Sequence, residues 1–311
     1  MIRRTVAAAA SFAAIVAGLG LAALQTTPAV GAPIFEIGKA HAEAEPTLTG
    51  SKPIFILLLG SDARTGTPVD KGLCDSIHIL GINPASGRAT LVGIPRDSYV
   101  PLSTGGTNKI NAAMPQGGPR AMVDTVEQLA GVRFSYYVLT SFDGFTRLIN
   151  ALGGLEVDVP YSFTGHLGTG FSQGGQTLDG ASALEFARTR KTLVHGDFDR
   201  SMNQGRLMLA ALMQFRKEFQ RDPAAMFRWA GAGMRNVETD IPLRELFTLA
   251  FTASQINLKK VTNAVTVGTI GTGPGGISIV DLPSPNPIFE DIAKDGYILP
   301  KDIPEENRPA N

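Results

Sequence analysis

The strongest constraint on the fold is an uninterrupted apolar segment, IFILLLG, at residues 54–60. A strand with one face in solvent alternates polar and apolar residues, so a continuous apolar run is typical of a strand covered on both faces. Two more strand-like segments, 76–83 and 88–95, are joined by the turn sequence PASG at 84–87. This turn predicts an antiparallel hairpin. The sequence therefore predicts a mixed central sheet.

Helical and strand-like segments alternate through the rest of the chain. We expect Pro119 to open a helix that Gly131 ends, and Ser141 and Asp179 to act as helix N-caps. The glycine-rich stretch 164–175 is expected to be a mobile loop. The other predicted segments are helices at 142–152, 180–187, 223–234, 242–256 and 286–294, a helix capped by Asp197 or Asp199, and strands at 135–140, 155–159 and 261–267. This pattern predicts one α/β domain over residues 53–311, with three α-β-α layers.

The N-terminus indicates export. Arg3 and Arg4 precede an uncharged apolar run, and residues 1–24 are long enough to form a membrane-spanning helix. Arginines before the run and acidic residues after it favour a single-pass protein of the bacterial cell membrane, with its C-terminal domain outside the cytoplasm. Small residues near position 40 leave open a cleaved signal peptide and an exported product. Residues 25–52, rich in Ala, Pro, Thr and Glu, are expected to be a linker.

Composition excludes several classes of function. The 28 basic and 28 acidic residues balance, with a sequence pI near 6.9, so no basic surface for nucleic acid is expected. A single cysteine, Cys74, excludes an internal disulfide and a zinc site built on several thiolates. With only four histidines scattered along the chain, a histidine-rich metal site is also not expected.

Positive charge is concentrated in one segment, residues 179–215. Arg188 and Arg190 fall on the same side of an extended stretch, and Arg200 and Gln204 lie one turn apart on the inward face of the next helix. One interpretation is a solvated ion-pair network with Glu185, Asp197 and Asp199. We favour the other, a phosphate site, because convergent guanidinium forks bind phosphate oxygens in a bidentate way. Lys191 and Arg206 complete the cluster.

The ends of the predicted strands carry further polar residues. Asp62 follows the first strand, Asp75 precedes the second, and Arg96 follows the third. Two carboxylates at one sheet edge would supply hard oxygen ligands for a magnesium ion that keeps most of its waters. Both aspartates can equally be loop or capping residues.

Five segments, in this order, resemble the LytR-CpsA-Psr family of cell-wall ligases. The likeness runs from Leu57 to about Phe215, and the ordered set is specific although each motif alone is weak. The segments are LLLGSDAR, CDSIHILGINPASGRATLVGIPRDSYVPL, KINAAMPQGGP, SFDGFTRLINALGGLEVDVP and LDGASALEFARTRKTLVHGDFDRSMNQGRLM.

The resemblance implies a membrane-anchored phosphotransferase. It would move a glycopolymer from a polyprenyl-pyrophosphate carrier to a peptidoglycan hydroxyl, with Mg²⁺, or alternatively Mn²⁺, as cofactor. In the family, aspartates that match Asp62 and Asp75 serve the metal and the pyrophosphate. The residues that match the family's phosphate-holding set are Arg96, Arg188, Arg190, Arg200 and Gln204.

One departure from the family pattern keeps other functions open. The family usually has an arginine two residues before the second aspartate, where this chain has Leu73, and Lys71 lacks the planar fork that would replace it. The alternatives are a non-catalytic scaffold that binds polyprenyl phosphates and a pyrophosphatase that acts on the same lipids. The carrier's isoprenoid also needs an apolar slot, for which residues 123–132 and 145–152 are candidates beside ordinary core packing.

Overall fold

The computed structural model describes residues 35–41, 52–225, 228–229, 237–242, 245 and 256–304. The predicted membrane segment, 1–24, lies outside these ranges, as do most residues of the helices predicted at 223–234 and 242–256. Within the described ranges, none of the helices has both the length and the apolar character needed to span a bilayer.

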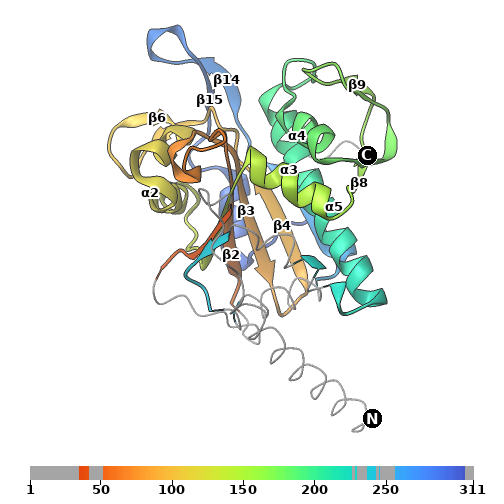
Figure 1. The fold of residues 1–311 in the computed structure, drawn as a ribbon. Helices are drawn as coiled ribbons and strands as arrows, with labels where there is room; N and C mark the ends of the chain where they lie inside the picture. Colours follow the sequence, from red (N-terminus) through yellow and green to blue (C-terminus); the bar gives the residue numbers. More distant parts are fainter. Residues whose placement is uncertain are drawn as a thin grey trace. The chain divides into compact units, whose positions relative to one another are not determined.

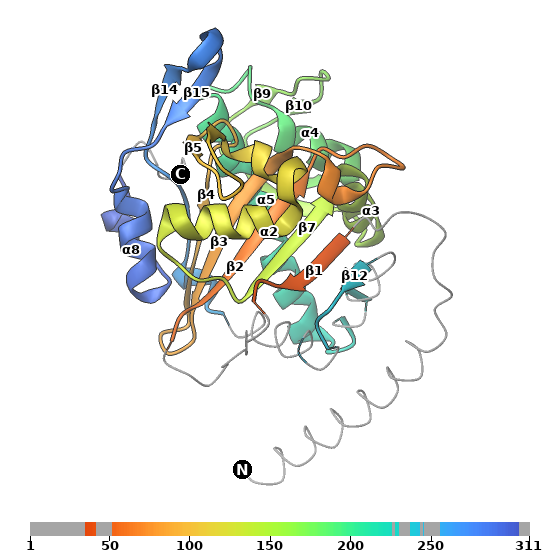
Figure 2. The ribbon, with the colours of Figure 1, turned by 90° about the vertical axis from the view of Figure 1, so that its left-hand side faces the viewer.

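A seven-stranded mixed sheet forms the centre of the domain (Figures 1 and 2). Adjacent strands are parallel in the pairs β1/β12, β2/β7 and β4/β13, and antiparallel in β1/β7, β2/β3 and β3/β4. The predicted mixed sheet and the predicted hairpin are confirmed. In spatial order the strands are β12 (Val237–Thr239), β1 (Phe35–Lys39), β7 (Tyr136–Ser141), β2 (Ile54–Ser61), β3 (Cys74–Asn83), β4 (Arg88–Gly93) and β13 (Val261–Val265).

Helices cover both faces of this sheet (Figure 1). On one face, α2 (Ala113–Ala130) and α8 (Pro287–Asp295) pack on Leu57 and Leu59 of β2. On the other face lie α3 (Phe142–Ala151), α4 (Gly180–Arg188) and α5 (Asp197–Arg221), and Ile54 and Ile56 belong to a core cluster with Leu212 of α5. The continuous apolar run of β2 therefore supplies both cores, as predicted.

Most predicted helix ends are also found, but α5 begins after Gly196 without a side-chain cap, so the predicted cap at Asp197 or Asp199 is wrong. The α2 backbone leaves helical geometry at Gly117 and Gly118, so regular helix runs from Pro119, and Gly131 ends it with φ 66°. The Ser141 hydroxyl accepts a hydrogen bond from Gly144 N, and Asp179 accepts one from Ser182 N. These caps fix where α3 and α4 begin.

The predicted linker at 25–52 contains a strand. Residues 35–39 form β1, which lies between β7 and β12 in the central sheet, so the fold begins before Pro53. Its polar side chains are paired within the protein: the Tyr137 hydroxyl donates to Glu36 at 2.5 Å, and Lys39 Nζ lies 3.5 Å from Glu245. A strand held by polar partners has no apolar run that would distinguish it from a linker.

The glycine-rich stretch is folded rather than a mobile loop. It contains β9 (Phe163–Thr164), β10 (Gly170–Phe171) and the start of β11 (Gly174–Leu178), which pairs with β8 (Leu155–Val159). The buried Glu185 carboxylate accepts hydrogen bonds from the backbone N–H groups of Leu167 (2.6 Å) and Thr169 (3.3 Å). A side chain 16 to 18 positions away therefore orders this lobe.

Two hairpins project from the sheet edge that carries the strand ends described below (Figure 2). One consists of β5 (Tyr99–Pro101) and β6 (Thr107–Lys109), the other of β14 (Thr269–Thr272) and β15 (Ser278–Asp281). Short 3-10 helices complete the described elements: η1 (Val69–Lys71), η2 (Ile110–Ala112), η3 (Leu258–Lys260), η4 (Pro274–Gly276) and η5 (Pro300–Asp302).

Candidate active site

The predicted site residues gather at one edge of the central sheet. The last residue of β2, Ser61, pairs with Cys74 at the start of β3, and Ile94, just after β4, donates its N–H to Ile77 O of β3 at 2.9 Å. Asp62, Asp75 and Arg96 therefore leave neighbouring strands at the same edge. The end of α4 and the first turn of α5 add the basic segment to it.

Asp62 holds the loop that precedes β3. Its Oδ1 accepts a hydrogen bond from Leu73 N at 2.7 Å, and its own N–H donates to Leu73 O at 2.9 Å. The Leu73 side chain, at the position where the family has an arginine, is 40% exposed. The capping role that the sequence left open for Asp62 is thus found in the structure.

Asp75 and Arg96 form a partly buried ion pair. Arg96 Nη1 lies 2.6 Å from Asp75 Oδ1. Burial opposes the charge on Arg96, but the carboxylates of Asp75, Asp97 and Asp197 together outweigh burial, so the pKa of the guanidinium is raised. Arg96 Nε is buried and has no hydrogen-bond partner among the described residues. A buried donor without a partner is costly, which suits a site that accepts a ligand oxygen.

Asp97 joins two cations that are far apart in the sequence. Arg190 Nη1 lies 3.1 Å from Asp97 Oδ2, and Lys109 Nζ lies 3.0 Å from Asp97 Oδ1. The sequence analysis selected neither Asp97 nor Lys109 as a site residue. The position of Asp97 next to a predicted site residue was the one signal that could have identified it.

Arg200 is paired with Asp197 in the first turn of α5, and both side chains are 6% exposed. Desolvation lowers the pKa of Arg200 and raises the pKa of Asp197 in spite of their mutual attraction. This sign is expected where the cost of removing two charges from water exceeds their attraction. A buried pair of this kind is weak evidence for stability, and a role of Arg200 in binding would account for it.

Gln204 and Arg188 differ in burial and in their hydrogen bonds. Gln204 is buried, and its Nε2 donates to Asp75 O (3.2 Å) and Ala187 O (3.1 Å), so it ties β3 to the end of α4. Arg188 is exposed, with its guanidinium 4.5 Å above the Phe142 ring, and makes no hydrogen bond or ion pair within the described part of the chain. Arg188 is free to bind an anion, whereas Gln204 positions the segments that carry the arginines.

The ion-pair interpretation of the basic segment is partly right. Asp197 pairs with an arginine as that interpretation expected. Glu185 instead holds the glycine-rich lobe, and Asp199 accepts hydrogen bonds from His195 N and the Tyr161 hydroxyl. Arg206 lines a separate cleft on the β8 side of α5.

Asp62 and Asp75 fit the magnesium ion that the family implies. Each uses Oδ1 in a hydrogen bond, and neither Oδ2 makes one to a described residue. Burial raises the pKa of Cys74, and the charges of Asp75 and Asp62 add to this effect, so each carboxylate lies near the Cys74 thiol. The described residues contain no cluster of three or more His, Cys, Asp or Glu side chains suited to a metal. Two carboxylate oxygens suit an ion that takes its other ligands from phosphate and water.

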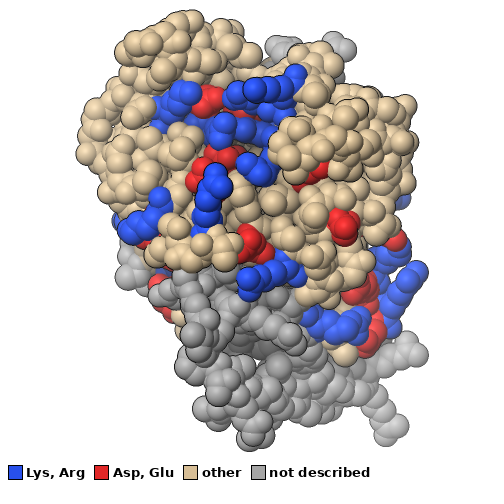
Figure 3. Space-filling view, turned by 45° about the horizontal axis from the view of Figure 1, so that its top comes forward, with Lys and Arg blue, Asp and Glu red and all other residues tan. Residues whose placement is uncertain are grey.

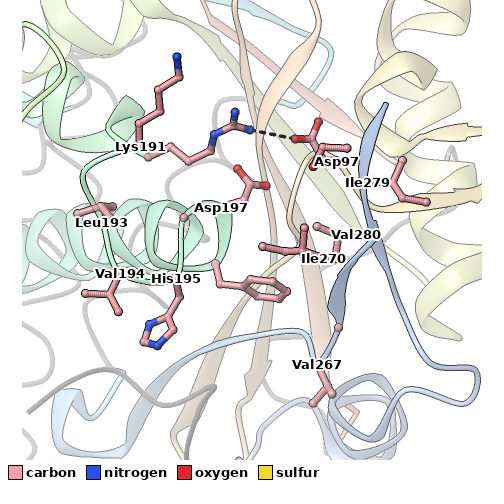
Figure 4. A pocket seen from close by; sticks show the side chains of 15 residues that line it. Asp97, Lys191, Leu193, Val194, His195, Asp197, Val267, Ile270, Ile279 and Val280 are labelled. Atoms are coloured by element: carbon pink, nitrogen blue, oxygen red, sulfur yellow. Dashed lines mark hydrogen bonds and ion pairs between the residues drawn. The ribbon is translucent and has the colours of Figure 1, made fainter. Parts of the chain in front are cut away.

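A cleft of about 580 Å³ adjoins the arginines, between the α4–α5 loop and the β14–β15 hairpin. Figure 4 shows Asp97, Lys191 and Asp197 at one end and Val267, Ile270 and other apolar side chains toward the other. The segments proposed for the isoprenoid, 123–132 and 145–152, do not line this cleft, and Val126 and Ile149 are buried in the core. The apolar space beside the arginines thus comes from parts of the chain that the sequence did not indicate.

A fully buried histidine holds the arginine-bearing turn of α5 on the sheet. His78 Nε2 lies 3.0 Å from Ser201 O, and because a carbonyl only accepts, Nε2 carries the proton. Asn263 of β13 adds a second bond, from Nδ2 to Met202 O at 3.1 Å. Both bonds set the position of Arg200 relative to the strand ends.

His78 predicts a specific loss of stability in acid. Burial lowers its pKa from 6.5 to about 4, so between these values the unfolded chain binds a proton that the folded protein excludes. The free energy of unfolding should therefore fall by about 3 kcal/mol as the pH drops from 6.5 to 4. His78→Gln keeps a donor near Ser201 O but does not titrate, so its denaturant midpoint should depend less on pH. The same pH dependence in both proteins would rule out His78 as its source.

Comparison with known proteins agrees with this geometry. The LytR_cpsA_psr family profile matches residues 33–282, and the chain belongs to this family. It is 32% identical over 246 residues to the polyisoprenyl-teichoic acid–peptidoglycan teichoic acid transferase TagV of Bacillus subtilis, covering 76% of this chain and 62% of that protein. The TagU transferase of Bacillus mycoides is 38% identical over 166 residues, 53% of each chain. The chain therefore spans less than two thirds of these relatives.

The crystal structure of B. subtilis TagV shares the fold. It superimposes with a TM-score of 0.66 and 31% sequence identity, covering 79% of this chain and 96% of that one. The match includes the mixed central sheet, which identifies the α/β domain as the fold of this family.

Proposed function

We propose that this protein transfers a phosphoglycosyl polymer from a polyprenyl-pyrophosphate carrier to a hydroxyl of peptidoglycan. The observation that carries the proposal is the convergence of arginines from three separate segments at one sheet edge: Arg96 after β4, Arg190 after α4 and Arg200 in α5. Such a set suits a diphosphate, whose charge must be neutralised during transfer. The relatives TagV and TagU are named as teichoic acid transferases, which supports the same reaction class.

The reaction consists of one displacement at phosphorus. The acceptor oxygen bonds to the phosphorus that carries the glycan, the bond from that phosphorus to the bridging oxygen breaks, and polyprenyl phosphate leaves. The acceptor's proton passes to a carboxylate. Asp62 and Asp75 are candidates for this role, but Asp197 lines the cleft and burial raises its pKa, which is the direction that suits a general base.

The arginines and the two strand-end aspartates have separate tasks. Arg96, Arg190 and Arg200 neutralise the diphosphate as charge moves to the leaving phosphate. The exposed Arg188, at the end of α4, adds a further phosphate contact. Asp62 and Asp75 would hold Mg²⁺, or alternatively Mn²⁺, which supplies further charge neutralisation when bound. Gln204 fixes the start of β3 relative to the end of α4 through its two hydrogen bonds.

Residues 1–24 are proposed as the membrane anchor, with the folded domain outside the cytoplasm. The support is the apolar run after Arg3 and Arg4 and the membrane residence of a polyprenyl carrier. Cleavage of this segment would give a secreted form, and the mass of the mature protein distinguishes the two.

The test follows a carrier with a labelled glycan during incubation with the full chain, magnesium and a peptidoglycan oligomer. Label in the oligomer supports the transferase. Release of glycan phosphate to water at the same rate with and without the oligomer would make the protein a pyrophosphatase. Tight carrier binding without turnover would make it a scaffold.

Leu73→Arg should raise turnover several-fold. The backbone N–H and C=O of Leu73 are both bonded to Asp62, and its side chain is 40% exposed, so a longer cation fits without burial and adds a planar donor at the site. Leu73→Gln is the matched control for size and polarity. Initial rates at saturating carrier compare the three proteins, and equal rates for Leu73→Arg and wild type would mean that an existing cation already fills this role.

A further inference from the structure

The end of the molecule that carries the site also exposes large apolar side chains. Six large hydrophobic residues are exposed in the described part of the chain, and Met213 on α5 is the one that lies away from this end. The others form what we call the apolar rim: Leu73, Leu167, Val194, Ile270 and Ile277, which are 40%, 76%, 77%, 65% and 42% exposed. Single exposed apolar residues are ordinary, but a group around a functional site marks an interaction surface.

Several contacts bring the rim residues together. Val194 and Ile270 line the same cleft, and Ile277 closes the hairpin that carries Ile270, where Gly273 N donates to Ile277 O at 2.8 Å. The Thr192 hydroxyl donates to Thr164 O at 2.6 Å, which joins the Val194 loop to the Leu167 lobe. Figure 1 shows β9, β14 and β15 at this same end. The rim is thus one surface made of three loops and the Leu73 turn.

Unpaired cations accompany the rim. Arg64, Arg188 and Lys191 are exposed and have no carboxylate partner among the described residues. In Figure 3 the Lys and Arg side chains gather in a band at this end, with uncharged surface on either side. Elsewhere, the exposed cations Lys217, Arg228 and Lys294 are paired with Glu156, Asp222 and Asp291, although Lys52 and Lys259 also have no carboxylate partner among the described residues. Apolar side chains beside free cations are typical of surfaces that bind anionic lipid.

The path of the chain is compatible with a membrane on this side. Phe35, the first residue of β1, pairs with Thr140, and Thr140 pairs with Gly60 near the end of β2. The chain therefore enters the sheet at the edge where the site lies. Residues 25–34 separate the proposed anchor from Phe35 and span at most about 35 Å when fully extended. In an anchored chain, this length bounds the distance of Phe35 from the bilayer.

We propose that the apolar rim docks on the outer surface of the membrane. Leu167, Val194, Ile270 and Ile277 enter the headgroup boundary, and Arg64 and Lys191 contact anionic headgroups. The inference rests on the proposed function for its choice of partner, because a polyprenyl carrier resides in that membrane. Docking brings the arginines to the level of the carrier's diphosphate.

The test measures the depth of single labels. Val194→Cys and Ile277→Cys are labelled with an environment-sensitive fluorophore in the full chain, in vesicles of phosphatidylcholine and phosphatidylglycerol with nitroxide-labelled lipid. Met213→Cys, an exposed apolar position on α5, is the matched control. Cys74 is fully buried and stays unlabelled. All three changes are on the surface, so the fold is retained.

We expect strong quenching at positions 194 and 277 and little at 213. Water-like emission at all three positions, or equal quenching at all three, would overturn the proposal, and the first result would leave a protein partner as the occupant of the rim. With phosphatidylcholine alone, quenching at positions 194 and 277 should fall several-fold. Unchanged quenching would mean that Arg64 and Lys191 do not contact anionic headgroups. Quenching does not depend on turnover, so an inactive transferase can still show a docked rim.

Discussion

Arg200→Leu should destabilise the protein by about 3–5 kcal/mol. The Asp197 carboxylate is only 6% exposed, and the substitution removes its ion-pair partner. An uncompensated buried charge of this kind costs about 3–5 kcal/mol. The loss should shrink as the pH falls, because the pKa of Asp197 is already raised by burial and protonation removes the charge. Urea unfolding at neutral and acidic pH measures both effects.

The matched control is the double variant Asp197→Leu/Arg200→Leu. Replacing both members of a buried ion pair with apolar residues is often neutral or stabilising. We therefore expect the double variant to be more stable than Arg200→Leu while its transferase activity is lost. If the double variant is less stable than the single one, the pair is a source of stability and its explanation as a functional cost is wrong.

Arg188→Ala/Arg190→Ala should lower carrier affinity and turnover together. A charge-assisted contact between a guanidinium and a phosphate is worth roughly 1.5–3 kcal/mol, so loss of Arg190 alone predicts a roughly 10- to 100-fold effect. Loss of Arg188 adds to it. Neither side chain is buried, so the denaturant midpoint should change little.

Lys217→Ala is the matched control for this double variant. Lys217 is an exposed cation paired with Glu156, on α5 but away from the strand ends. Affinity for a polyprenyl diphosphate is measured by equilibrium binding, and turnover by transfer of label. Wild-type affinity in the double variant would exclude both arginines from the phosphate site, and a similar loss in Lys217→Ala would indicate a general charge effect.

The parts of the fold that the sequence predicted are those with a local signal. The apolar run of β2 predicted a strand covered on both faces, and Ser141, Asp179 and Gly131 marked helix ends through their own side-chain chemistry. β1 was taken for linker because Glu36 and Lys39 find their partners more than 100 positions away in sequence. The glycine-rich lobe was missed for a related reason, since the Glu185 carboxylate that orders it belongs to the next helix.

In the candidate site, too, local sequence signals predicted some features, whereas others depend on contacts between distant parts of the chain. The grouping of Arg190 and Arg200 was predicted from their spacing together with the resemblance to the family, whereas Arg188 ends α4 and stacks on Phe142. The pairing of Arg190 with Asp97 joins residues 93 positions apart and could not be read from spacing. Gln204 shared the predicted face with Arg200, yet its bonds to Asp75 O and Ala187 O depend on how three elements pack.

The most direct test of the central claim is the mass of the product formed by the full chain from a defined polyprenyl-pyrophosphate glycan and a peptidoglycan oligomer. Attack at the glycan-bearing phosphorus predicts an oligomer that has gained the glycan and one bridging phosphate, with polyprenyl monophosphate as the other product. An oligomer that gains the glycan without phosphate would mean attack at the sugar carbon. In that case the arginines would serve a leaving diphosphate, and the phosphotransferase mechanism would be wrong.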